Sequence, residues 1–291
     1  MLDFIRWALL VDRPFDLFKR GGAGQVGAVT RYAALISYDG SAFHGFQRQS
    51  DLLTVQAVLE ETLSILNKES VKVTCAGRTD SGVHALGQVV HFDMYWPHGL
   101  RSLRRALQAN LPPSIGVFDV ASVSDDFDAR KSALWRKYVY FIWKGESRLP
   151  HLNKYIWWNK NAWDMEKARS FLTMIEGCHD FGAFCRKADR PSNTRRTIIE
   201  AGMETDGFAV KVTITGRSFL TNMVRIIIGT MDQIAMGRKS LSDVGRLLEE
   251  GSREDAGLTA PAKGLFLWQV QYDPLPWNST EYIATARNFI F

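Results

Sequence analysis

The stretch AGRTDSGVHALGQVVHF, residues 76–92, decides the fold of this chain, because it contains a glycine-bracketed turn that joins two strand-like runs. The turn carries one carboxylate, Asp80. The runs VKVTCA and GQVVHFDMYW are rich in the β-branched and aromatic residues that favour strands. A loop held at both ends by buried strands keeps its side chains in place, and such loops often carry function. An ordinary turn, in which Asp80 and Ser81 hydrogen-bond to nearby backbone, is the alternative that the local sequence leaves open.

Outward from this loop, the first half of the chain predicts four strands and two helices. The first strand ends at the turn signal Asp39-Gly40, and the second helix is stopped by Pro112-Pro113. The predicted elements are a strand at 31–38, a helix at 54–66, strands at 71–76 and 87–96, a helix at 100–111 and a strand at 115–123. This β-α-β-β-α-β order is the split βαβ arrangement, in which two helices back a four-stranded antiparallel sheet.

The second half repeats this order with different residues. Its hairpin turns at Asp206-Gly207, a strong turn signal. The predicted elements are a strand at 135–144, a helix at 164–177, hairpin strands at 195–205 and 208–216, helices at 219–237 and 240–250, and a strand at 265–273. We therefore predict an α+β fold of two ferredoxin-like, RRM-like β-α-β-β-α-β domains, whose antiparallel sheets join around a central cleft. A cleft between domains is a common place for a ligand.

The predicted organisation has four parts. Two α/β domains, residues 31–124 and 125–276, lie between an N-terminal extension with a Gly-rich linker at 1–30 and a tail at 277–291. The extension is predicted to be an appended amphipathic helix or an overlong start. Its GxGxxG match, at Gly22, Gly24 and Gly27, has no strand before it and no helix after it, so it indicates a linker rather than a dinucleotide site.

The amino-acid composition limits the classes of function that this chain can have. The 291 residues include 36 Lys+Arg and 31 Asp+Glu, and the net charge of +5 mildly favours a polyanionic partner. Three cysteines, Cys75, Cys178 and Cys185, form neither a disulfide framework nor a CxxC pair, which favours a reducing compartment and hence the cytoplasm. No apolar run approaches the roughly 20 residues of a membrane-spanning helix.

Six blocks of the sequence, in order from about residue 31 to 273, resemble the tRNA pseudouridine synthase A family. AGRTDSGVHALGQVVHF is similar to its catalytic segment and is highly specific. The other blocks are YDGSAFHGFQRQ at 38–49, TVQAVLE at 54–60, DDFDARKSALWRKYVY at 125–140, SFLTNMVRIIIG at 218–229 and APAKGLFLWQVQY at 260–272. The resemblance implies a homodimer that modifies uridines 38, 39 and 40 in the anticodon stem-loop of tRNAs. No metal or small-molecule cofactor is expected, because uridine and pseudouridine are isomers.

The same resemblance implies roles for five side chains. Asp80 is the implied nucleophile on a flipped-out uridine, and its target could be C1′, C6 or a ribose proton. Arg225 is the implied ion-pair partner that keeps Asp80 ionised and oriented, although an arginine on an apolar helix can instead extend to solvent. Tyr138 and Leu265 are expected to lie against the uracil, where core packing is the alternative, and Arg78 is expected to enter the RNA helix.

The chain departs from the family pattern at two positions beside Arg225. Asn222 stands where histidine is frequent, and Ile226 where asparagine is frequent, so the support around Arg225 could differ. Further basic residues could bind phosphates as groups, although each alone is an ordinary surface charge: Arg101, Arg104, Arg105, Arg186, Lys187, Arg190, Arg195 and Arg196.

Two other classes of function fit parts of the sequence. A noncatalytic RNA-binding protein would explain the charge and topology, but the expected aromatic RNA-recognition signature is not found. A small-molecule enzyme on a ferredoxin-like fold would explain Asp80 with Arg225, because fold alone does not specify function.

Overall fold

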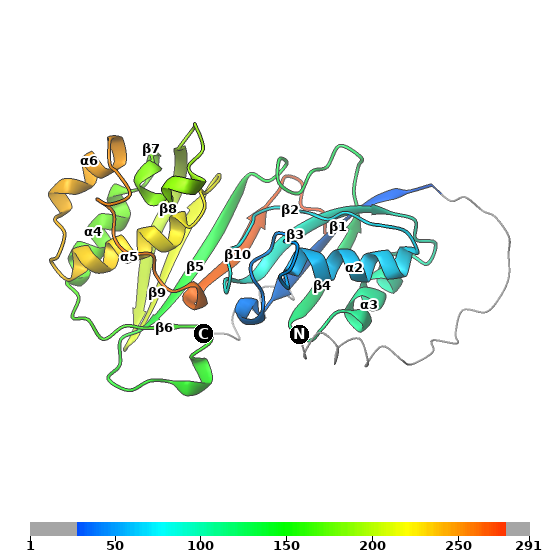
Figure 1. The fold of residues 1–291 in the computed structure, drawn as a ribbon, viewed down its shortest axis with the longest axis horizontal. Helices are drawn as coiled ribbons and strands as arrows, with labels where there is room; N and C mark the ends of the chain where they lie inside the picture. Colours follow the sequence, from blue (N-terminus) through cyan, green and yellow to red (C-terminus); the bar gives the residue numbers. More distant parts are fainter. Residues whose placement is uncertain (1–27, 278–291) are drawn as a thin grey trace.

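Ten strands join in one continuous sheet in the computed structural model, which describes residues 28–277 (Figure 1). The strands are β1 (Thr30–Tyr38), β2 (Thr74–Cys75), β3 (His84–Met94), β4 (Ile115–Ser122), β5 (Trp135–Trp143), β6 (Trp157–Trp158), β7 (Gly177–Asp180), β8 (Arg195–Asp206), β9 (Ala209–Gly216) and β10 (Leu265–Gln271). The main path runs β4-β1-β3-β10-β5-β9-β8-β7, with β2 beside β3 and β6 beside β5. The α+β class is therefore confirmed, but the sheet is mixed, because β10 runs parallel to β3 and β6 parallel to β5.

Five α-helices accompany the sheet within residues 28–277. They are α2 (Val55–Asn67), α3 (Leu100–Asn110), α4 (Met165–Met174), α5 (Met223–Ala235) and α6 (Val244–Glu249). In Figure 1, α2 and α3 accompany β1–β4, and α4–α6 lie with β7–β9 at the other end of the sheet. None of the helices in this part of the chain is both long and apolar enough to cross a membrane.

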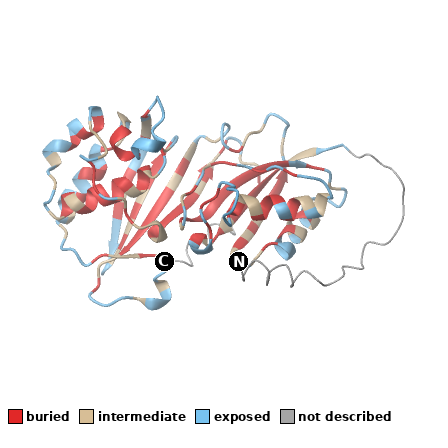
Figure 2. Cartoon of the chain, in the orientation of Figure 1, coloured by how far each residue is buried: buried red, intermediate tan, exposed pale blue. Residues whose placement is uncertain are grey.

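The buried hydrophobic side chains form two clusters, which lie on opposite sides of β5. The larger one combines side chains from both sets of helices with residues of the strands, including Tyr138 and Tyr140 of β5. Val139 and Phe141, which alternate with them, point into a smaller cluster with Leu86 and Trp268. Figure 2 shows that the strands in the middle of the sheet are buried along most of their length, and that α2 and α3 are buried on one side. The helix α5 is instead buried on nearly all sides. The helical layer thus covers one face across both halves of the chain.

Several boundaries differ from the prediction for identifiable reasons. α5 begins at Met223, not at 219, because Asn222 adopts a left-handed conformation with φ of 61° that helical residues do not share. The short strands β6 and β7 were not predicted, since two and four residues carry too little periodicity. The extension, its GxGxxG match and nearly all of the tail lie outside the described residues.

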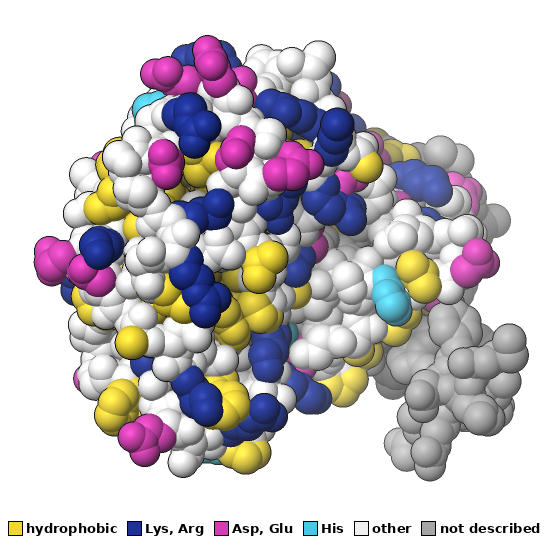
Figure 3. All heavy atoms as spheres, turned by 60° about the vertical axis from the view of Figure 1, so that its left-hand side comes forward, with side chains coloured by type: hydrophobic (Ala, Val, Ile, Leu, Met, Phe, Trp, Pro, Cys, Tyr) yellow, Lys and Arg dark blue, Asp and Glu magenta, His cyan; other side chains and the backbone are white. Residues whose placement is uncertain are grey.

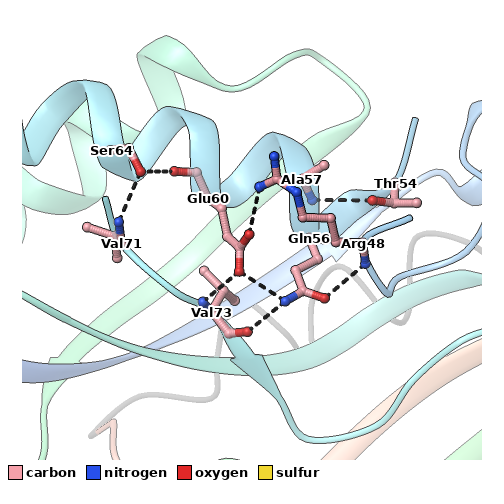
Figure 4. A network of polar contacts seen from close by, with 8 residues as sticks. All are labelled: Arg48, Thr54, Gln56, Ala57, Glu60, Ser64, Val71 and Val73. Atoms are coloured by element: carbon pink, nitrogen blue, oxygen red, sulfur yellow. Dashed lines mark hydrogen bonds and ion pairs between the residues drawn. The ribbon is translucent and has the colours of Figure 1, made fainter. Parts of the chain in front are cut away.

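β2 is also shorter than predicted, because side chains of α2 bind the backbone that precedes it (Figure 4). Glu60 accepts a hydrogen bond from the Val73 N–H at 3.2 Å, and Gln56 donates one to the Val73 carbonyl at 3.1 Å. Ser64 accepts one from the Val71 N–H at 3.0 Å. These bonds replace the ladder of a strand. Glu60 is itself buried and pairs with Arg48 at 2.8 Å, which anchors the loop before α2.

β10 joins the two halves because it pairs with both. Its residues Phe266 and Leu267 pair with His84 and Ala85 of β3, and its other edge pairs with β5. β2 occupies the same edge of β3 further along, at Val90 and His91. β3 therefore exchanges one neighbour for another partway along its length, and the loop at 76–83 leaves the sheet at that exchange.

Gly87 provides a test of this junction. A Cβ atom at position 87 would lie 2.5 Å from the Trp268 carbonyl oxygen, which is backbone and cannot move aside easily. Gly87→Ala should lower the free energy of unfolding by about 1–3 kcal/mol, measured by chemical denaturation. The control is Gly202→Ala in β8, where a Cβ meets nothing within 4 Å. Equal stability of the two variants would show that the β3–β10 contact is not tight.

Candidate active site

A cleft of about 880 Å³ lies between the loop at 76–83 and the beginning of α5. Its lining comes from both halves of the chain, including the loop at 44–49 and the segment at 218–225. A larger cavity of about 1160 Å³ runs along the outer side of α2, but none of the predicted site residues lines it. The cleft, by contrast, is lined by all five: Arg78, Asp80, Tyr138, Arg225 and Leu265.

Asp80 and Arg225 form an ion pair across the cleft. The Arg225 Nη1 atom lies 3.2 Å from the Asp80 Oδ2 atom, and the two side chains are 17% and 24% exposed. Arg225 also donates from Nε to the Ala260 carbonyl at 2.8 Å and from Nη1 to the Asn222 side chain at 2.9 Å. The guanidinium is therefore held in one orientation and does not extend to solvent.

The two departures from the family pattern have different consequences. Asn222 occupies the N-cap position of α5 in the left-handed conformation without a side-chain capping bond, and its Oδ1 atom is one of the three acceptors that orient Arg225. Ile226 is fully buried in the main core and does not line the cleft. Only the first departure thus contributes directly to the support of Arg225.

Tyr138 is a buried tyrosine whose hydroxyl makes no hydrogen bond with any residue of the described range. A Cβ atom at Gly77 would lie 3.5 Å from this hydroxyl, which is an ordinary van der Waals contact. Burial raises the pKa of Tyr138 well above its usual value; Asp80 adds to this and Arg136 opposes it. The group therefore stays protonated. Its ring meets Phe219 edge-on at 5.0 Å between centroids, and Phe219 also lines the cleft.

Arg78 and Leu265 both line the cleft, but they differ in how far they are exposed to solvent. Arg78 is exposed, and its guanidinium forms no hydrogen bond or ion pair within residues 28–277. Leu265 is buried at the start of β10, where it pairs with Tyr140 of β5. The first can bind a ligand without breaking a contact, and the second provides a fixed apolar wall.

The cleft is strongly basic. Six arginines and only two acidic residues line it: Arg48, Arg78, Arg130, Arg136, Arg186, Arg225, Asp80 and Asp189. Figure 3 shows further Lys and Arg side chains spread over the side of the molecule formed by the second half. Such a lining favours a polyanionic ligand.

Several of these lining residues were not predicted. Arg136 is buried, and it donates to the Ala76 carbonyl from Nε at 3.2 Å and from Nη2 at 2.9 Å. Burial lowers the pKa of Arg136. Its position two residues before Tyr138 in a strand was a usable signal, because such residues share a face. Arg48 and Phe219 come from loops, whose approach to the cleft has no sequence period.

Most of the basic residues proposed as phosphate contacts lie elsewhere. Of the eight, only Arg186 lines the cleft, where it pairs with Asp189 at 2.6 Å. Arg101 and Arg105 are exposed on α3, which packs on β4 at the edge of the sheet. Arg190 packs over Gly182 instead of pointing at the cleft.

His84, the first residue of β3 after the loop, does not line the cleft. It accepts a hydrogen bond from the Gly40 N–H at 3.0 Å, its Nε2 atom lies 3.0 Å from the Lys154 carbonyl, and its ring stacks on Phe266. Burial lowers the pKa of His84, so the neutral ring is favoured and its role is to join segments. Across residues 28–277, no group of three or more His, Cys, Asp or Glu side chains could hold a metal ion.

Comparison with known proteins agrees with this arrangement. The sequence profile described as tRNA pseudouridine synthase matches residues 34–130 and 172–273. Proteins named tRNA pseudouridine synthase A are similar over nearly their whole length. That of Geobacillus sp. (strain WCH70) is 39% identical over 244 residues, 84% of this chain and 98% of the relative. That of Streptococcus mutans serotype c is 40% identical over 247 residues, 84% of this chain and 99% of the relative. The chain therefore belongs to the tRNA pseudouridine synthase family and is an isomerase that acts on uridines of tRNA.

Proposed function

We propose that this enzyme converts uridines 38, 39 and 40 of the tRNA anticodon stem-loop to pseudouridine, with Asp80 as the nucleophile on a flipped-out nucleotide. The observation that carries the proposal is the ion pair of Asp80 with Arg225 in a cleft lined by six arginines. A partly exposed carboxylate among so many cations is accessible to a sugar whose phosphates are held by arginines.

The reaction requires a group that can act on the sugar or the base without leaving the site. The C1′–N1 bond breaks, the uracil rotates, and a C1′–C5 bond forms, while C5 loses a proton and N1 gains one. Asp80 could attack C1′, add at C6, or remove a ribose proton to give a glycal-type intermediate. Arg225 holds the carboxylate in one orientation in each case, because a hydrogen bond between two charged groups is strong and directional.

The uracil would lie against Tyr138, with Leu265 and Phe219 on the cleft wall. Aromatic contact with a base contributes about 1–3 kcal/mol. The Tyr138 hydroxyl has no partner among the described residues and stays protonated, so it is available to donate to the base or to relay a proton. These groups can hold a rotating ring without a covalent link to it.

Arg78 would enter the RNA helix at the vacated position. A stem uridine must leave its stack before Asp80 can reach it, at a cost of a few kcal/mol. An exposed guanidinium without protein partners in the described range can contact phosphates or bases there. Recognition of shape rather than base sequence would accommodate three neighbouring target positions.

We also propose the organisation that the resemblance implies. Residues 31–124 and 125–276 would be two ferredoxin-like domains, since the strand orders β4-β1-β3-β2 and β10-β5-β9-β8 correspond when the short strands β6 and β7 are left out and the four remaining strands of each half are numbered along the chain. A homodimer in the cytoplasm would bind one tRNA across both subunits. A noncatalytic RNA-binding protein and a small-molecule enzyme both account less well for the family match.

Asp80→Asn should abolish the release of tritium from tRNA labelled at uracil C5, because an amide is a poor nucleophile and base. Binding to tRNA, measured by electrophoretic mobility, should change by less than about threefold, since phosphate contacts dominate affinity. The control is Asp206→Asn at the exposed end of β8. Retained release in Asp80→Asn would remove Asp80 from the mechanism.

Arg225→Lys should lower kcat by roughly 10- to 100-fold, because one ammonium cannot contact the three acceptors that the guanidinium reaches, and a hydrogen bond to a charged group contributes about 1.5–3 kcal/mol. The Kd for tRNA should change much less. Arg238→Lys, an exposed position after α5, is the matched control. An unimpaired kcat would show that the pair with Asp80 is only structural.

Arg78→Ala should weaken tRNA binding and reduce by about one the slope of log affinity against log salt, as expected for one lost phosphate contact. Titrations at four or more salt concentrations measure this slope, with Arg238→Ala as the control. Weaker binding with an unchanged slope would instead point to a base contact of Arg78.

A further inference from the structure

The start of the loop that carries Asp80 is held by one fully buried side chain, Gln88 of β3. Its Nε2 atom donates to the Gly77 carbonyl at 2.6 Å, and its Oε1 atom accepts from the Gly77 N–H at 3.3 Å. The carboxamide therefore binds both polar groups of one peptide residue, as a neighbouring strand would.

The Gln88 side chain takes the place of a strand at the point where the neighbour of β3 changes from β2 to β10. Pairing with β2 ends at Cys75 and Val90, followed by one bond from the Ala76 N–H to the Val89 carbonyl at 2.8 Å. Beyond this point the chain turns into the cleft, and β10 takes the edge of β3. At Gly77 the backbone has left the ladder, and the Gln88 side chain takes the place of the missing strand.

A β-bulge turns Gln88 toward the loop. The pairing of β1 with β3 moves from Ile36–Gln88 to Tyr38–Ala85, so β3 contains one residue more than β1 over this stretch. Without the extra residue, Gln88 would share a face with Leu86, whose side chain lies in the smaller cluster on the opposite side of the sheet.

Gln88 belongs to a chain of contacts that reaches the residue before Asp80. Its Nε2 atom lies 3.4 Å from the Tyr38 hydroxyl, which lies 2.8 Å from the Thr79 hydroxyl. Gly77 also lies near the Tyr138 hydroxyl, which would be 3.5 Å from a Cβ atom at position 77. The loop that presents Asp80 is thus fixed by a polar network whose donors and acceptors are matched.

We propose that Gln88 is a positioning residue for the isomerisation. Its carboxamide holds the Gly77 backbone near Tyr138. Through Tyr38 and Thr79, it also determines the direction in which the Asp80 side chain points. The inference rests on the proposed role of Asp80. It differs from simple stabilisation of the fold, because the required feature is one donor and one acceptor, not volume.

Gln88→Met keeps the volume and removes both hydrogen-bonding groups. It should lower single-turnover rates by roughly 10- to 100-fold, the effect of a small misplacement of a reacting group, with the Kd for tRNA within about threefold of the parent. Assays are run well below the melting temperature found by circular dichroism. The control is Gln108→Met on α3, which removes a side-chain bond to the Val117 N–H far from the cleft.

Gln88→Glu separates positioning from packing through its pH dependence. A carboxyl at this buried position has a raised pKa, and when protonated it again offers one donor and one acceptor to Gly77. When ionised, it places an oxygen against the Gly77 carbonyl. The ratio of its rate to that of the parent enzyme should therefore rise as pH falls, whereas the ratio for Gln88→Met should stay flat.

A parent-like rate in Gln88→Met, or a flat ratio for Gln88→Glu, would overturn the inference while leaving an inactive Asp80→Asn, and with it the proposed function, intact. Activity in Asp80→Asn would remove both. If Gln88→Met does not fold, Tyr38→Phe carries the test, because it deletes only the hydroxyl between Gln88 and Thr79. It should lower the rate several-fold without changing the Kd, and an unchanged rate would count against the network.

Discussion

The pairing of β10 with both β3 and β5 is the constraint on which the rest of this structure depends. Asp80 and Arg225 are 145 residues apart in sequence and belong to different halves of the chain. They meet at 3.2 Å because one strand from the end of the described region lies between those halves and closes the sheet. The larger hydrophobic cluster extends across the junction, so the ion pair forms between two segments that pack on one continuous core.

Some polar groups of the cleft have hydrogen-bond partners in the protein, whereas others have none among the described residues. The chemistry of the cleft follows from this difference. Arg225 and Arg136 have their donors directed at protein acceptors, so they hold the loop and the carboxylate in place. Arg78 and the Tyr138 hydroxyl have no such acceptors in the described range. The first pair is therefore engaged by the protein itself, whereas the second pair is available to a ligand that enters the cleft.

The sequence was informative where a pattern is local. Long strands and helices, the turn at Asp206-Gly207 and the loop around Asp80 could all be predicted, because periodicity and turn chemistry act over a few residues. The continuous sheet could not, since the register between β10 and β3 is set by contacts between distant segments. The position of Arg48 in the cleft could not be predicted from the sequence either, because it depends on the ion pair of Arg48 with the buried Glu60 of α2. Family resemblance located Tyr138 and Arg225, which their local sequence left ambiguous.

The bulge in β3 also constrains how this chain can vary in length. Between Ala85 and Gln88 the strand has one residue more than its partner, and this surplus determines which face the later side chains occupy. Removing a single amino acid there would reverse the orientation of every residue on one side of the deletion, exchanging core positions with the opposite surface. Surface loops can gain or lose residues with little harm, but in this short interval the number of residues determines which face of the sheet Gln88 occupies.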